Sequence, residues 1–269
     1  MPTISAFGDE IADDLETQIA VLASEQIRFI EFRGAWGKNI LDLDRSELAR
    51  AGELLRASGF GLSAIASPIG KSSLDQPRSF EQQRLDRAAA ACDALGTRLV
   101  RVFSFYYQPQ SAEAARAEVL DRMGLLAARA AALGLTLVHE NEKEIFGDTA
   151  ERCADLLASV DSAALRMAFD PANFVQCGVR PMSTAWPLLC PYVTHVHIKD
   201  ASMADGAVTV AGDGDGDLPA LLAALHEQEY DGFLTLEPHL AVAGAFGGFS
   251  GEPEMRRAIA ALRQLLTQL

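Results

Sequence analysis

Four residues that can bind a metal ion or transfer a proton lie at regular intervals in the second half of the chain. They are Glu140, Asp170, His197 and Glu237, separated by 30, 27 and 40 residues. Each ends or follows a short apolar run with the composition of a strand. Because side chains alternate along a strand, one residue at each strand end can face the same space. We therefore expect three carboxylates and one imidazole to converge.

Such a cluster favours a bound cation. Three carboxylates held together repel one another, and a divalent ion removes that conflict. Carboxylate-rich ligation with one imidazole favours Mn²⁺ or Mg²⁺, with Co²⁺, Zn²⁺ and Fe²⁺ as alternatives. One divalent metal is therefore the expected cofactor. The alternative interpretation makes each of the four a solvated loop residue or a helix cap.

The elements that must position these residues alternate along the whole chain. Strands are expected at 2–7, 28–32, 61–66, 98–104, 135–140, 165–170, 192–198 and 232–237. Helices are expected at 13–25, 45–58, 80–95, 111–132, 149–159, 182–189, 217–228 and 252–268. This alternation predicts parallel strands joined by crossover helices.

Eight such units in 269 residues predict an α/β fold, a closed eight-stranded parallel (β/α)8 barrel forming one domain over residues 1–269. A doubly wound open sheet is the alternative. It usually carries a glycine-rich phosphate turn after its first strand, and here that position reads Gly8-Asp9-Glu10.

Further charged residues lie at the carboxyl ends of the predicted strands, where a barrel carries its functional groups. Glu31, Arg33, Lys71 and Arg101 could hold a polyol, a carboxylate or a phosphate, or could form a ring of salt bridges that seals the rim. His195 shares strand parity with His197 and would lie one layer lower, as a core histidine or as a support for the ligand. His139 has the opposite parity to Glu140 and should face the helices.

The segment Gly212-Asp213-Gly214-Asp215-Gly216-Asp217 suggests a calcium loop, but it lacks the residue order of an EF-hand. We instead expect a loop at the barrel mouth, with Asp217 capping the helix that follows. The glycine-rich stretch 243–251 is also expected to be a loop, and Phe249, Ser250 and Gly251 could line the pocket.

Composition excludes several classes of protein. The chain has 23 basic and 37 acidic residues, a net charge of −14, which argues against a nucleic-acid partner. Apolar residues make up 49%, enough for a sizeable core. No apolar run is long enough to span a membrane, and the first residues have no features of a signal peptide, so we expect a cytoplasmic protein. Four scattered cysteines are expected to be reduced, with two disulfides as the alternative.

Several motifs together resemble the sugar phosphate isomerase/epimerase superfamily of xylose isomerase-like TIM barrels. The resemblance rests on His195-Val196-His197-Ile198-Lys199-Asp200, on Phe169-Asp170-Pro171-Ala172-Asn173-Phe174, on Glu140 at its strand end, and on Leu236-Glu237-Pro238-His239. The superfamily includes ketose 3-epimerases, inosose dehydratase, hydroxypyruvate isomerase and endonuclease IV. The resemblance implies that Glu140, Asp170, His197 and Glu237 bind the metal. It also implies that the two glutamates act as the acid/base pair.

The resemblance implies an enzyme acting on a small sugar, a sugar phosphate or a keto-polyol. One glutamate would remove a proton beside a carbonyl and the other would return one, through a metal-stabilised enediolate, giving an isomerase or epimerase. Lys199, Asn173, Arg101, Lys71, Glu31, Arg33 and His195 are the expected substrate-binding residues. Relatives of this kind form homodimers or homotetramers, and this sequence does not decide between them.

Two alternatives use the same site. A dehydratase or lyase acting on a cyclic keto-polyol or keto-acid would expel a β-hydroxyl group from the same enolate. A non-catalytic sugar-binding barrel would bind without turnover, and would usually lack one of the four metal-binding residues. Endonuclease IV is disfavoured, because its three zinc ions need more ligands than a chain with five histidines offers, and Asn173 stands where several relatives carry histidine.

Overall fold

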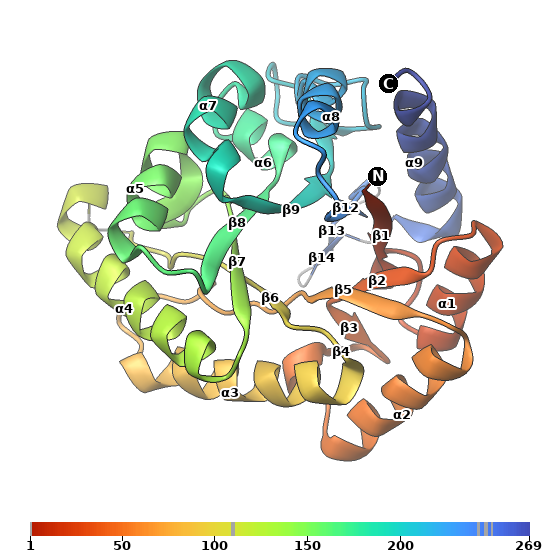
Figure 1. The fold of residues 1–269 in the computed structure, drawn as a ribbon, viewed down its shortest axis with the longest axis horizontal. Coiled ribbons are helices and arrows are strands. Elements are labelled where there is room, and N and C mark those ends of the chain that lie inside the picture. The colour runs from red at the N-terminus through yellow and green to blue at the C-terminus, as the bar shows by residue number, and fades with distance from the viewer. Residues whose placement is uncertain (1, 109–110, 241–242, 245–246, 249) are drawn as a thin grey trace.

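The computed structural model describes residues 2–108, 111–240, 243–244, 247–248 and 250–269. Eight parallel strands close into a barrel in the order β1-β12-β9-β8-β7-β6-β5-β2, with helices around the outside (Figure 1). The strands are β1 (Thr3–Phe7), β2 (Phe29–Phe32), β5 (Gly61–Ile65), β6 (Leu99–Val102), β7 (Thr136–Glu140), β8 (Leu165–Phe169), β9 (Val193–Ile198) and β12 (Phe233–Leu236). Each lies within its predicted range. The closed barrel is confirmed and the open sheet is wrong.

Seven of the eight predicted helices form as regular α-helices. They are α1 (Leu15–Ser24), α2 (Arg45–Ala57), α3 (Arg78–Leu95), α4 (Ala112–Ala132), α5 (Ala150–Val160), α8 (Leu218–Glu227) and α9 (Gly251–Leu266). The side chain of Ser111 accepts a hydrogen bond from the Ala114 N–H at the start of α4, and Gly134 just beyond the helix has φ of 65°. Both features fit the residue types that set the predicted boundaries.

The segment predicted as one helix over 182–189 is divided between two helical pieces, and a third piece follows it. A π-helical turn covers Pro181–Ala185, α7 covers Trp186–Leu189, and a 3₁₀ turn covers Cys190–Tyr192. Prolines at 181, 187 and 191 explain this, since each lacks the N–H that a continuous helix needs.

The sequence interpretation also missed one short helix, α6 (Pro171–Gln176). Its signal is an Asp-Pro pair. The Asp170 side chain accepts a hydrogen bond from the Asn173 N–H, and Pro171 occupies the first helical position.

Short antiparallel hairpins lie in the loops beyond the barrel. They are β3 (Gly34–Ala35) with β4 (Lys38–Asn39), β10 (Asp200–Ala201) with β11 (Val208–Thr209), and β13 (Ala243–Gly244) with β14 (Gly247–Gly248). The stretch 243–251, expected as a loop, therefore contains a hairpin, and α9 already begins at Gly251. Phe249 lies outside the described residues.

The loop over residues 212–217 wraps around the Asp200 carboxylate. Asp200 accepts backbone hydrogen bonds from Gly212, Gly214 and Gly216 at 2.8–3.1 Å. The backbone N–H groups of this loop point inward at the carboxylate anion of Asp200. A calcium loop instead points oxygen atoms inward at a cation, so this loop is not a calcium site of that kind. Asp217 occupies the N-cap position of α8 with φ of 53°, and its side chain makes no capping hydrogen bond, so that prediction is wrong.

Two further expectations were reduced cysteines and no segment able to span a membrane. Cys92, Cys153, Cys177 and Cys190 are all unpaired, and the first two are buried. Among the described residues, no helix combines the length and the apolarity needed to cross a bilayer.

Candidate active site

The four residues predicted to converge do so at one end of the barrel. Glu140 ends β7, Asp170 follows β8, His197 lies in β9 and Glu237 follows β12. One nitrogen or oxygen from each lies within 4.8 Å of the others, and all four side chains are buried. His197 Nδ1 is 3.2 Å from Glu140 Oε1, and 3.8 Å from both Asp170 Oδ2 and Glu237 Oε2. The imidazole nitrogen therefore faces three carboxylates.

Local structure explains how the carboxylates are aimed. Asp170 caps α6 with Oδ1 at 2.9 Å from the Asn173 N–H, which leaves Oδ2 for the cluster. The Asn173 side chain donates to Glu140 Oε1 and to the Asn141 carbonyl, both at 3.0 Å. The Glu237 backbone N–H donates to the Ile198 carbonyl of β9. In this structure Asn173, expected to bind substrate, contacts and orients Glu140.

Three buried cations surround the cluster. Lys199 Nζ is 2.9 Å from Asp170 Oδ2 and 3.1 Å from Glu237 Oε2. An Arg101 terminal nitrogen lies 3.2 Å from Glu140 Oε2 and 3.7 Å from Glu237 Oε1. Arg33 lies 3.2 Å from the same Glu237 oxygen. These cations offset much of the repulsion that the sequence argument assigned to a metal alone.

The protonation of the cluster follows from these contacts. Burial alone would raise the pKa of Glu140, but His197 and Arg101 outweigh it and lower the pKa to about 2. The pKa of Glu237 is likewise lowered despite burial, chiefly by Lys199 and His239. Burial wins at Asp170, whose pKa rises. The pKa of His197 rises against burial because Glu140 and Glu31 favour its charged form.

Three buried polar atoms of the cluster make no hydrogen bond of regular geometry. They are His197 Nδ1 and two carboxylate oxygens, Glu140 Oε2 and Asp170 Oδ2, which are held only by ion pairs to Arg101 and Lys199. Three such atoms aimed at one point suit a bound cation. The donor set, three carboxylates and one imidazole, fits Mn²⁺ or Mg²⁺.

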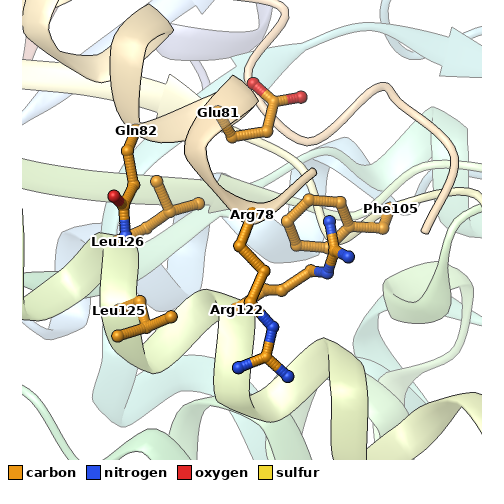
Figure 2. Close-up of a pocket in the computed structure, with 7 residues that line it drawn as sticks. All are labelled: Arg78, Glu81, Gln82, Phe105, Arg122, Leu125 and Leu126. Carbon is orange, nitrogen blue, oxygen red and sulfur yellow. The ribbon is translucent and has the colours of Figure 1, made fainter. Parts of the chain in front are cut away.

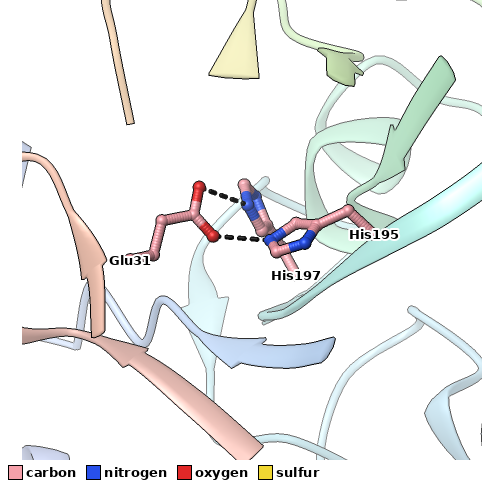
Figure 3. A group of neighbouring side chains, drawn as sticks. All are labelled: Glu31, His195 and His197. Carbon is pink, nitrogen blue, oxygen red and sulfur yellow. Dashed lines mark hydrogen bonds and ion pairs between the residues drawn. The ribbon is translucent and has the colours of Figure 1, made fainter. Parts of the chain in front are cut away.

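Glu31 and His195 lie on the far side of His197 (Figure 3). Glu31 Oε2 is 2.5 Å from His195 Nε2, and Glu31 Oε1 is 3.3 Å from His197 Nε2. All three side chains are completely buried. Burial would raise the pKa of Glu31, but the two imidazoles lower it well below its usual range. Both residues, expected to touch substrate, instead contact one another behind the metal-binding candidate.

The remaining predicted residues lie nearer the mouth. Lys71 is partly exposed, pairs with Glu142 at 3.0 Å and lies over the Phe103 ring. Arg33 is buried and also pairs with Asp9 and Glu10. His139 faces away from the cluster and contacts Ser104, as its strand parity predicted.

Sequence reasoning missed three contributors to this network. Asp9 and Glu10 hold Arg33 at 2.7 and 3.0 Å, and His239 contacts Glu10 at 3.0 Å and Glu237 at 3.5 Å. The signal was available, since Asp9 and Glu10 directly follow β1, and His239 lies two residues after Glu237. Applying the strand-end rule to the first strand would have found the acidic pair.

A separate small pocket lies between α3 and α4 (Figure 2). Its lining includes Phe105 and Arg122, and Arg122 donates to the carbonyls of Leu74 and Gln76. None of the four clustered residues lines it, so this pocket is distinct from the candidate active site.

The barrel and its cluster agree with a family comparison. The model of the xylose isomerase-like TIM barrel family matches residues 19–265. The chain therefore belongs to this family, and the resemblance stated from its motifs is confirmed.

Individual relatives are more distant. Inosose dehydratases from Clostridium perfringens and Clostridium botulinum are each 28% identical, over 141 and 138 residues. The matched part is 45% of this chain and 45% of the Clostridium perfringens protein, so less than half of that relative is covered.

Solved structures share the fold over nearly the whole chain. A D-tagatose 3-epimerase-like protein has a TM-score of 0.78 at 16% identity, covering 98% of this chain and 97% of the other. A probable 3-DHS dehydratase from Bacillus anthracis has a TM-score of 0.77 at 16% identity, covering 98% and 99%. D-Psicose 3-epimerase from Clostridium cellulolyticum H10 has a TM-score of 0.74 at 15% identity, covering 98% of each. At these identities the likeness establishes the fold alone.

Proposed function

We propose that this chain is a divalent-metal-dependent enzyme that transfers a proton beside the carbonyl of a sugar or keto-polyol, as an isomerase or epimerase. The observation that carries the proposal is the buried convergence of Glu140, Asp170, His197 and Glu237, one nitrogen or oxygen of each lying within 4.8 Å of the others. Epimerases among the structural neighbours support the same reaction class.

Glu140, Asp170, His197 and Glu237 would hold the ion. When bound, a divalent cation in such a site polarises a carbonyl and stabilises negative charge on oxygen. One glutamate carboxylate would accept the proton from the carbon beside the carbonyl and later release it to solvent, and the other, after taking a proton from solvent, would return it to carbon. Because the two glutamates follow different strands, they can approach opposite faces of a planar intermediate.

The surrounding cations position the glutamates for this work. Arg101 contacts both carboxylates, and Lys199 contacts Glu237 and Asp170. Asn173 fixes Glu140 through Oε1. These contacts restrict the directions in which the carboxylates can point, which is the usual requirement for efficient proton transfer.

A dehydratase is the second candidate, favoured by the sequence match to inosose dehydratases. The same proton removal would then be followed by loss of a β-hydroxyl group as water. Product mass separates the two candidates, since epimerisation and isomerisation leave the mass unchanged.

The first experiment is metal stoichiometry by elemental mass spectrometry after loading with Mn²⁺. We expect about one ion per chain, and loss of that ion in Asp170→Ala and His197→Ala, because each removes one ligand of a mononuclear site. No binding above background in the wild-type protein would contradict the proposal.

The second experiment is deuterium incorporation from D₂O into ketohexoses and a keto-inositol, followed by mass spectrometry and NMR. We expect Glu140→Gln and Glu237→Gln to abolish exchange while circular dichroism shows that the variants remain folded, because an amide cannot accept the proton. Exchange at the wild-type rate in both variants would rule out this mechanism.

A further inference from the structure

A buried carboxylate crosses the barrel interior to reach the back of the His197 ring. Glu31 lies on β2, whereas His195 and His197 lie on β9, and two strands separate β2 from β9 in the barrel order. Figure 3 shows the carboxylate facing both imidazoles at once. All three side chains have no exposed surface. Glu31 therefore has both carboxylate oxygens committed to the two imidazoles.

The hydrogen-bond inventory of these residues fixes where the imidazole protons lie. An ionised carboxylate only accepts, so each nitrogen that faces it must donate. Glu31 Oε2 faces His195 Nε2 and Oε1 faces His197 Nε2. Both histidines therefore carry a proton on Nε2.

The consequence for His197 concerns its other nitrogen. Nδ1 has no hydrogen bond and lies 3.2–3.8 Å from three carboxylate oxygens. With the Nε2 proton committed to Glu31, Nδ1 is the nitrogen left to face the three carboxylates, as a protonated donor in the metal-free protein. A divalent cation that takes the place of this proton would be bound by Nδ1 and by the same three carboxylates.

We propose that Glu31, itself held by His195, is a positioning residue that locks His197 with Nε2–H donated to Glu31 and Nδ1 directed at the divalent cation. This rests on the proposed function. It assigns Glu31 and His195 a role other than substrate contact, and it specifies which nitrogen of His197 ligates.

His195 completes the arrangement by fixing Glu31. Its Nε2 lies 2.5 Å from Glu31 and 3.1 Å from Thr235 Oγ1 on β12. The Phe7 ring meets the His197 ring edge-on, with centroids 5.3 Å apart. His197 is thereby held by the aromatic contact as well as by the carboxylate behind it. Partners of this kind set the orientation and basicity of a ligating histidine, and losing one typically costs 10–100-fold in metal affinity.

The test compares Mn²⁺ affinity, measured by electron paramagnetic resonance of the free ion, in wild type, Glu31→Gln and Glu81→Gln. Glutamine at 31 offers one acceptor instead of two, so one imidazole loses its partner. We expect the dissociation constant to rise at least tenfold. Glu81 is the matched control: it is a buried carboxylate that binds Gly70, Ser72 and Arg84, outside the cluster. Its variant should bind Mn²⁺ as wild type does.

A measurement on the wild-type protein covers the case in which Glu31→Gln fails to fold. Protein with ¹⁵N-labelled histidine and saturating Mg²⁺ should show His197 protonated on Nε2 and not on Nδ1, by long-range ¹H–¹⁵N correlation. Only five histidines are present, and the spectrum of His197→Gln assigns the signal. A proton on Nδ1 with the ion at Nε2 would overturn the inference.

The outcomes also separate this inference from the proposed function. Unchanged Mn²⁺ affinity in Glu31→Gln, with wild type binding one ion, overturns the role of Glu31 alone. Failure of the wild type to bind Mn²⁺ overturns both.

Discussion

At the scale of single residues, Glu237 makes the largest number of charged contacts in the cluster. Lys199, Arg101 and Arg33 all lie within 3.7 Å of its carboxylate, and His239 lies at 3.5 Å. Asp170, by contrast, contacts one lysine and has a raised pKa. Lys199 is therefore the cation on which the balance of charge at the cluster depends most directly.

Lys199→Met should destabilise the metal-free protein. Asp170 would lose the lysine with which it pairs, and Glu237 would lose one of the several cations that contact its carboxylate. Removing one partner of a buried ion pair typically costs about 3–5 kcal/mol. We expect a lower free energy of unfolding in urea, and a larger rise in unfolding temperature on adding Mn²⁺ than in wild type, because the ion replaces the missing charge.

The control for this prediction is Lys143→Met, at an exposed position. Equal responses of Lys199→Met and wild type to Mn²⁺ would show that Lys199 and the ion do not compensate the same carboxylates.

At the scale of elements, two short segments position the site. Helix α6 uses Asp170 as its cap, so the residue that begins the helix also faces the cluster. Beyond β9, the loop over 212–216 is folded around Asp200, the residue next to Lys199. A Cβ atom at Gly214 would lie 2.4 Å from Asp200 Oδ1, which explains why glycine is required there.

Asp200→Ala should lower the free energy of unfolding by about 3 kcal/mol, since several backbone N–H groups would lose their acceptor. Asp200→Asn should cost less, because one acceptor oxygen remains. Urea unfolding measures both. Asp213→Ala, at an exposed residue of the same loop, should be neutral. A neutral Asp200→Ala would mean that the carboxylate does not organise the loop.

Sequence reasoning recovered the barrel because periodicity and strand spacing are local signals that the fold preserves. It also recovered the four clustered residues, since strand ends of a barrel meet at one face. It could not assign which side chains contact one another inside the barrel. Whether Glu31 faces the mouth or His195 depends on packing across the barrel, which no local pattern encodes. The role of Asp200 was hidden for the same reason, because the three glycine N–H groups that donate to its carboxylate lie 12 or more residues further along the chain.

At the scale of the whole molecule, the pairing of the charged side chains around the barrel mouth indicates whether the substrate is charged. Four cations at or beside the cluster are already paired: Arg33, Arg101 and Lys199 with the cluster or its neighbours, and Lys71 with Glu142. The undescribed positions 109–110, 241–242, 245–246 and 249 carry no basic side chain. A phosphate or carboxylate group would find no unpaired cation among these residues.

We therefore expect an uncharged sugar or polyol to be the better substrate. In competition assays, a ketohexose should inhibit deuterium exchange on the true substrate at least tenfold more strongly than its phosphate ester, because an unpaired buried phosphate is costly. Tighter inhibition by the phosphate ester would contradict this prediction.

The closure of the barrel has a consequence for biosynthesis. Strand β1 pairs with β12, so the barrel can close only after β12, the last of its eight strands along the chain, has been synthesised. Glu237 follows that last strand, and its partner Arg33 lies 204 residues earlier. A nascent chain can therefore hold three of the four clustered residues and still lack a second glutamate. The four-residue cluster is therefore completed only at a late stage of synthesis.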